Sequence, residues 1–189
     1  MGAKCSPSFF QALMDRVLGS LRFTHAITYL DDIIISSRSF EEMMDKTKLV
    51  LSALRKANLT LKPSKCVFAT KCLRYLGFVV SEKGVMVDPD KIAAIVNLSQ
   101  PNDVKTLRSF LGKVNYFHEF IPGYSTIAAP LYNLIKNDSE FGKRPDVWKT
   151  EHTEAFNKLK LCLTKAPILK QFNSSLETEL ITDASTSGI

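Results

Sequence analysis

The sequence predicts an α+β fold in which short antiparallel strands pack with amphipathic helices. Two patterns favour this class. Apolar residues recur at helical spacing in several segments, and other segments combine β-branched runs with turn residues. The chain has 189 residues, of which 45% are hydrophobic and 23% are charged, so it is long enough to bury a core.

The first predicted element is a helix that Ser6 caps and Gly19 ends. Serine is a favoured cap, and glycine commonly follows the last helical turn. Residues 23–36 come next as two apolar runs around a short polar break, which is the pattern of a β-hairpin. Asp31 and Asp32 occupy the predicted turn of this hairpin.

A second helix is predicted after Ser39, because Ser39 and Glu42 form a capping-box pattern. Its apolar positions predict a buried stripe that includes Val50, Leu51 and Leu54. The short strand candidates that follow are separated by lysine-rich or glycine turns and cover residues 59–61, 67–69 and 75–80.

The remainder of the chain is predicted to be mainly helical. The expected helices begin at Pro89, carry an apolar face over residues 107–117, and then cover approximately residues 125–135 and 151–163. Residues 137–146 are rich in charge, Gly and Pro, so they form the best linker candidate. Residues 176–182 alternate like the first strand of a new unit.

The net charge of +6 is concentrated in the first part of the chain. Residues 1–80 carry 12 Lys and Arg against 6 Asp and Glu, whereas residues 81–189 carry 13 of each. A basic region of this kind suits a polyanionic partner, of which nucleic acid is the commonest. Taken alone, this is a weak indication, because many soluble domains are modestly basic.

Targeting signals and metal-binding spacings are both missing from the sequence. No stretch approaches 18 consecutive apolar residues, and the N-terminus lacks the pattern of a signal peptide. We therefore expect no membrane partner and an intracellular protein, in a cytoplasmic particle or the nucleus rather than secreted. The four cysteines lie in no zinc-ligand spacing with the histidines, which predicts reduced and mostly buried thiols.

Asp31 and Asp32 are the strongest candidates for chemistry. Two adjacent carboxylates in a tight apolar hairpin repel each other unless a cation neutralises them, and Mg²⁺ is the natural oxygen-seeking partner. Pairs of such ions serve phosphoryl and nucleotidyl transfer. The alternative is that the two acids are solvent-exposed turn residues that bind no metal. The pattern alone leaves both interpretations open.

A series of motifs resembles the reverse transcriptases of gypsy-type LTR retrotransposons. Tyr29-Leu30-Asp31-Asp32 matches their Y-x-D-D box. Further segments resemble the family in order and spacing, namely residues 2–11, Leu61 to Phe68, Tyr75 to Phe78, Asp88 to Ile92, Phe110 to Phe117, Ala128 to Leu131, Ala155 to Lys160 and Thr182 to Ser185. The resemblance therefore extends over almost the whole chain.

This resemblance implies an RNA-directed DNA polymerase with an associated ribonuclease H. Asp31 and Asp32 would be two of three palm carboxylates that hold two Mg²⁺ ions, for which Mn²⁺ could substitute. The third carboxylate is expected upstream of Gly2. Asp183 would be the first metal ligand of the ribonuclease H site, with the others expected beyond Ile189. Both active sites are thus expected to be incomplete within this chain.

The resemblance also implies residues that contact primer and template. These are Tyr29, Gln11, Leu76, Gly77, Lys113 and Tyr116. Where relatives carry two basic residues after the thumb aromatics, this chain has His118 and Glu119, which puts phosphate binding there in doubt. Core packing is the simpler expectation for Phe110 and Phe117.

The implied organisation has four parts. They are a partial palm with the carboxylate hairpin and primer-grip-like turn at residues 1–80, a helical thumb at 81–136, a linker and connection helix at 137–175, and the start of a ribonuclease H-like domain at 176–189. The implied partners are an RNA or DNA template–primer duplex, dNTPs in the complete enzyme, and the remainder of the Pol polyprotein. The alternative is a truncated or domesticated remnant that at most binds nucleic acid.

Overall fold

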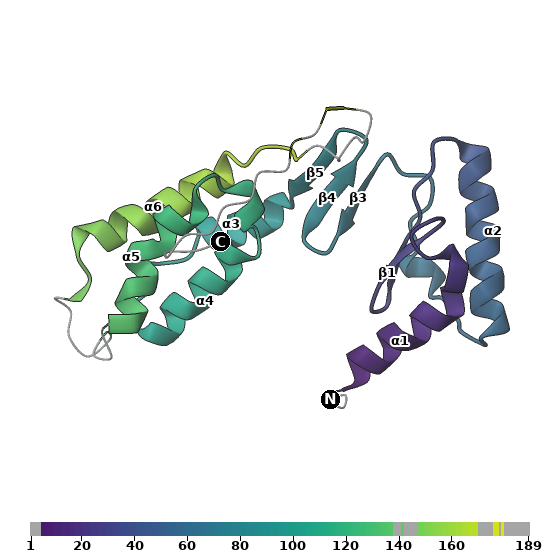
Figure 1. Cartoon of the computed structure of the whole chain (residues 1–189), viewed down its shortest axis with the longest axis horizontal. Coiled ribbons are helices and arrows are strands. Elements are labelled where there is room, and N and C mark those ends of the chain that lie inside the picture. Colours follow the sequence, from purple (N-terminus) through teal and green to yellow (C-terminus); the bar gives the residue numbers. More distant parts are fainter. Residues whose placement is uncertain (1–4, 138–140, 142–146, 170–175, 178, 180–189) are drawn as a thin grey trace. The chain divides into compact units, whose positions relative to one another are not determined.

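The computed structural model describes residues 5–137, 141, 147–169, 176, 177 and 179. The chain divides into two compact units, residues 1–70 and residues 71–189. Both units combine helices with a small antiparallel sheet, and the predicted α+β class is confirmed (Figure 1).

The first unit is built from two helices and a hairpin. Its elements are α1 (Ser6–Leu18), a 3-10 turn (Gly19–Leu21), β1 (Ile27–Tyr29), β2 (Asp32–Ile34), α2 (Phe40–Lys56) and a second 3-10 turn (Pro63–Lys65). Helix α1 packs against both α2 and β1. The core of this unit is small and consists of Met14, Leu18, Ala26, Val50 and Leu54.

Some predictions for this unit are wrong in detail. The cap of α1 is Cys5 instead of Ser6, and no side chain accepts a hydrogen bond there. Leu51 is 41% exposed and does not belong to the buried stripe of α2. The strands expected at residues 59–61 and 67–69 do not form, because these segments pair with no other strand in the part of the chain that the structure describes.

The second unit begins with a three-stranded sheet. Strands β3 (Cys72–Tyr75), β4 (Phe78–Ser81) and β5 (Gly84–Val87) pair antiparallel in that order. Leu76 and Gly77 form the two-residue loop between β3 and β4, with φ of 50° and 79°. Positive φ at both positions is the pattern of a type I′ turn, which suits the right-handed twist of a hairpin.

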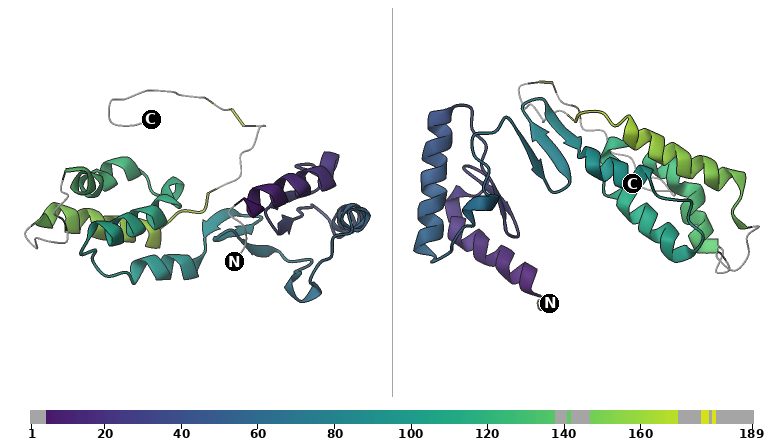
Figure 2. Two further views of the ribbon diagram at one scale, coloured as in Figure 1. Left: turned by 90° about the horizontal axis from the view of Figure 1, so that it is seen from below. Right: turned by 180° about the vertical axis from the view of Figure 1, so that it is seen from behind.

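Helices α3 (Pro89–Val96), α4 (Val104–Asn115), α5 (Tyr124–Asn137) and α6 (Thr150–Thr164) complete this unit. Helices α5 and α6 lie side by side, as both Figure 1 and Figure 2 show. The predicted helices of this region are confirmed. Phe110 and Phe117 are 2% and 4% exposed, which confirms their predicted place in the core.

The remaining predictions fall partly outside the described residues. Asp183 and most of the strand expected at residues 176–182 lie there. The expectation of mostly buried thiols is wrong for Cys5 and Cys72, which are exposed, whereas Cys66 and Cys162 are half-buried. Among the described helices, none combines the length and apolar character needed to cross a bilayer.

Candidate functional site

The β1–β2 hairpin carries one acid in its two-residue loop and the other at the start of β2. Tyr29 pairs with Asp32 across the hairpin, so Leu30 and Asp31 form the loop itself. Leu30 has a φ of 53°, a conformation that is unfavourable for a residue with a bulky side chain. This cost is about 1–2 kcal/mol and must be offset by other contacts.

Gln11 of α1 supplies such contacts. Its Oε1 atom accepts a hydrogen bond of 2.6 Å from the backbone N–H of Leu30, and its Nε2 atom lies 3.5 Å from the Thr28 hydroxyl. The same Nε2 donates to Asp15 at 2.9 Å. Gln11 therefore fixes the turn that carries the acids, while its predicted direct contact with primer or template stays a prediction.

Asp31 and Asp32 are both exposed. Within the residues that the structure describes, neither carboxylate forms an ion pair, and no group of three or more His, Cys, Asp or Glu side chains converges. Two adjacent carboxylates without a neighbouring cation suit a hard divalent ion such as Mg²⁺. Such a pair can supply only part of the coordination shell of an ion of this kind.

Tyr29 lies at the other end of the two-residue loop and is 52% exposed. Its neighbour on the same face of β1 is Ile27, which is 49% exposed. Both side chains are apolar or largely apolar, so the hairpin offers an uncovered surface beside its acids. A stacked base or sugar would suit this surface.

The second unit holds a groove that is lined by four of the predicted site residues. Leu76, Gly77, Lys113 and Tyr116 line a hollow of about 430 Å³. The other lining residues are Lys91, Ala94, Ile95 and Phe117. An apolar floor between two lysines suits a ligand that combines apolar surface with negative charge, such as a sugar–phosphate chain.

Tyr116 joins the turn to the helices. Its hydroxyl donates a 2.8 Å hydrogen bond to the Leu76 carbonyl, and its ring stacks on Phe78 at a centroid distance of 5.5 Å. The ring remains 55% exposed. Tyr116 thus both holds the Leu76-Gly77 turn and offers a surface to a ligand.

Two residues of this region were not predicted as site residues. Lys91 lines the groove together with Lys113, and Asp88 is 6% exposed although it is an acid. Their signal in the sequence was the segment from Asp88 to Ile92, which resembles the family and starts a helix. A charge pattern alone does not reveal which lysine of a helix faces a groove.

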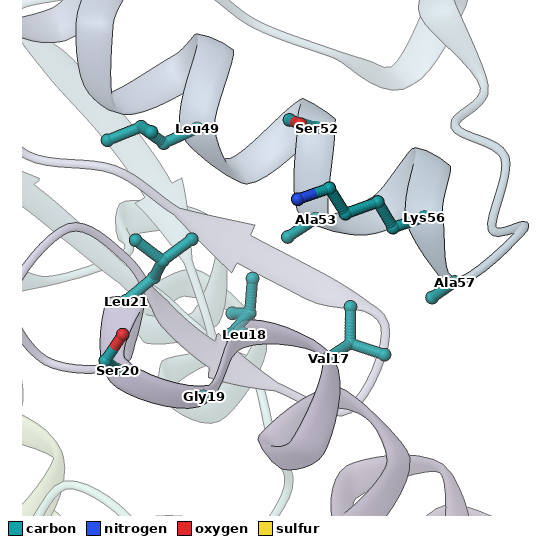
Figure 3. Close-up of a pocket in the computed structure, with 10 residues that line it drawn as sticks. All are labelled: Val17, Leu18, Gly19, Ser20, Leu21, Leu49, Ser52, Ala53, Lys56 and Ala57. Carbon is teal, nitrogen blue, oxygen red and sulfur yellow. The ribbon is translucent and has the colours of Figure 1, made fainter.

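A separate hollow of about 510 Å³ lies in the first unit, between the end of α1 and the last turns of α2 (Figure 3). Val17, Leu18 and Leu21 line it on one side and Ala53 and Lys56 on the other. No predicted site residue belongs to it. It therefore adds nothing to the hairpin that carries Asp31 and Asp32.

Comparisons with known proteins agree with the motifs. Residues 1–80 match the family model of reverse transcriptase (RNA-dependent DNA polymerase), and residues 148–189 match that of the RNase H-like domain found in reverse transcriptase. The chain is 36% identical over 184 residues to the Tf2-3 and Tf2-4 transposon polyproteins of Schizosaccharomyces pombe. The match covers 97% of this chain and 13% of each relative, so the chain spans a small part of their length.

Solved structures of a reverse transcriptase are also similar to this chain. The foamy viral protease–reverse transcriptase in complex with dsDNA has a TM-score of 0.79 and 26% identity over 92% of this chain and 36% of its own. The same protein in complex with an RNA/DNA hybrid has a TM-score of 0.76 and 27% identity, over 88% of this chain and 22% of its own. Residues 1–80 are thus similar to a segment of the reverse transcriptase family, and residues 148–189 are similar to the RNase H-like domain found in it.

Proposed function

We propose that this chain is the part of a retrotransposon RNA-directed DNA polymerase that carries two catalytic carboxylates and binds the primer end. The observation that carries this proposal is the exposed Asp31-Asp32 pair on a turn that Gln11 holds in place. The reverse transcriptase match over residues 1–80 supports the same assignment. The gypsy type of element is proposed from the motif order and the similarity to transposon polyproteins.

The two carboxylates would act as metal ligands in nucleotidyl transfer. Asp31 and Asp32 would hold Mg²⁺ or Mn²⁺, which neutralises phosphate charge when bound. The hairpin contributes the position of the two acids, since positioning and charge neutralisation supply most of the rate in phosphoryl transfer. Tyr29 would pack beside the primer end, and dNTPs would be the second substrate.

The groove of the second unit would hold the template–primer duplex. Lys91 and Lys113 line the groove together with the Leu76-Gly77 turn and can neutralise phosphates, and the exposed Tyr116 can contact a sugar or base. The foamy viral structures contain dsDNA or an RNA/DNA hybrid, which supports a duplex as the ligand. His118 and Glu119 are exposed, and the Glu119 carboxylate would repel a phosphate.

The proposed organisation keeps the four parts expected from the sequence. These are a palm segment at residues 1–80, a thumb at 81–136, a connection at 137–175 and the start of a ribonuclease H-like domain at 176–189, where Asp183 would be a metal ligand. The remainder of a Pol polyprotein would supply the other palm and ribonuclease H carboxylates. The 189-residue chain alone is therefore proposed not to extend primers.

The test is primer extension by a complete polymerase that includes this chain. Asp31→Asn should abolish incorporation of dNTPs on an RNA template, because an amide is a poor ligand for Mg²⁺. Asp45→Asn is the matched control, since Asp45 is an exposed acid of α2 that pairs only with Lys48 at 3.5 Å. Extension by the Asp31→Asn enzyme at the wild-type rate would overturn the catalytic assignment.

A further inference from the structure

We propose that Asp88 is a positioning residue, which fixes the Leu76-Gly77 turn against α3 and so sets the shape of the groove. This inference depends on the proposed binding of a duplex in that groove. Asp88 is one of two polar residues that are buried in the described part of the chain, and the other is His152. A buried carboxylate is costly unless several partners engage it.

Three contacts of Asp88 join different elements. Its Oδ1 atom accepts a 2.9 Å hydrogen bond from the backbone N–H of Asp90, which caps α3. Its Oδ2 atom lies 3.7 Å from Nη1 of Arg74 on β3. Its own backbone N–H donates a 3.0 Å hydrogen bond to the carbonyl of Gly77. One residue therefore joins the sheet, the turn and the helix.

The register of the sheet explains why this residue can reach the turn. Val87, the last residue of β5, pairs with Phe78, the first residue of β4. The next residue along the chain therefore leaves the sheet beside the Leu76-Gly77 turn. Arg74 also pairs with Asp90, so the guanidinium bridges both acids at the start of α3.

Both carbonyls of the turn are consequently engaged by neighbouring elements. The Gly77 carbonyl accepts from Asp88, and the Leu76 carbonyl accepts from the Tyr116 hydroxyl of the α4 end. Lys91 is connected to the same cap, because its backbone N–H donates a 2.9 Å hydrogen bond to the Asp88 carbonyl. The position of Lys91 in the groove thus depends on Asp88, although Asp88 itself does not line the groove.

Two variants separate the contacts of the carboxylate. Asp88→Asn keeps a good helix cap and removes the charge that faces Arg74, whereas Asp88→Ala removes both. The probe is a fluorescein-labelled DNA primer annealed to an RNA template, titrated with the 189-residue chain and followed by anisotropy. We expect about tenfold weaker binding for Asp88→Ala and about threefold for Asp88→Asn, with Glu82→Gln of the β4–β5 turn as the unchanged control.

A positioning role also predicts coupling to the lysines. In a Lys91→Ala/Lys113→Ala background, Asp88→Ala should weaken binding no further, because the groove has lost the cations that Asp88 positions. Additive losses, or a change in the fluorescence of Trp148, which packs near Phe156 of α6, would mean that Asp88 only stabilises the fold. Either result would overturn the proposal, as would wild-type affinity in Asp88→Ala.

Amide hydrogen exchange tests, independently of duplex binding, whether the Asp88 side chain fixes the turn. In Asp88→Ala, we expect faster exchange at residue 88 and unchanged exchange in α6, because the N–H donor to the Gly77 carbonyl loses its fixed position. If the wild-type chain binds no duplex, the proposed function of the groove fails while this readout still tests the positioning. Unchanged exchange at residue 88 in both variants would overturn it.

Discussion

The two units of the molecule differ in how much apolar surface they bury. Among the described residues, the core of residues 71–189 contains eighteen buried apolar residues, and that of residues 1–70 contains five. The exposed large apolar side chains show the opposite distribution, with thirteen in the first unit and six in the second. The hairpin with Asp31 and Asp32 therefore belongs to the less well-packed unit.

This difference suggests a division of roles. Burial of apolar surface is the main favourable term in folding, so residues 71–189 have the larger internal source of stability. Residues 1–70 expose large apolar side chains such as Phe9 at 75% and Phe23 at 76%, and contiguous exposed apolar surface usually meets a partner. We infer that the groove can form from its own unit, whereas the hairpin with Asp31 and Asp32 lies in the unit that has less internal stabilisation.

The largest effect is expected from the core of the second unit. Phe110→Ala should lower the free energy of unfolding by about 3–5 kcal/mol, because the ring is buried and packs on Phe156 at a centroid distance of 4.5 Å. Phe9→Ala in the first unit should change it by less than about 0.5 kcal/mol. Urea titration followed by circular dichroism measures both. Equal effects would remove the contrast between the units.

A smaller effect on stability is expected from substituting Gly84, and the same substitution at Gly112 serves as its control. Gly84 has a φ of 126°, and a Cβ atom there would lie 2.2 Å from the carbonyl oxygen of Leu169, whose backbone pairs with Val85. Gly84→Ala should therefore destabilise by at least about 1–3 kcal/mol.

Gly112 is the matched control for this substitution. A Cβ atom on this residue of α4 would meet nothing within 4 Å. Gly112→Ala should therefore stabilise the helix by about 0.5–1 kcal/mol. Thermal unfolding of both variants checks the pair, and a destabilised Gly112→Ala would show that the helix surface is not open.

The smallest effect concerns pH. Burial lowers the pKa of His152 from its ordinary value of 6.5, against the opposing effect of Glu151. Its neutral Nδ1 accepts a 2.9 Å hydrogen bond from the backbone N–H of Lys149 at the start of α6. The contribution of neutral His152 to the free energy of unfolding is complete above pH 6.5. It is lost as the pH falls, because the unfolded chain binds the proton at a higher pH than the folded chain.

The control for this prediction is His152→Gln. Glutamine can accept the same hydrogen bond without titrating, as in an ordinary capping box. The difference in stability between pH 7.5 and pH 5.5 should therefore shrink in the variant, measured by urea titration followed by Trp148 fluorescence. An undiminished difference would assign the pH dependence to other groups.

The sequence predicted best the long amphipathic helices and the features that depend on neighbouring residues. The face of α4 with Leu107, Phe110 and Val114 was predicted and is buried, and Ser39 accepts from the Glu42 N–H as the capping pattern predicted. Two adjacent acids between apolar runs likewise predicted the hairpin turn. These features depend on residues close together in the sequence.

Features that depend on distant partners were missed. Residues 59–61 and 67–69 have strand-like composition, but strands need neighbours, and none pairs with them among the described residues. Leu51 follows the helical period yet is 41% exposed. Asp88 caps α3 locally, but it reaches Arg74 and the Gly77 carbonyl only through the sheet register, which no local pattern encodes.

The most direct test of the division between the units is primer extension by the 189-residue chain itself. A labelled DNA primer on an RNA template is incubated with the chain, Mg²⁺ and dNTPs, and is analysed on native and denaturing gels. We expect a retarded complex without any lengthening of the primer, because under the proposed function the groove would bind the duplex while Asp31 and Asp32 would supply only two of the metal ligands. Lengthening of the primer by this chain alone would contradict the division.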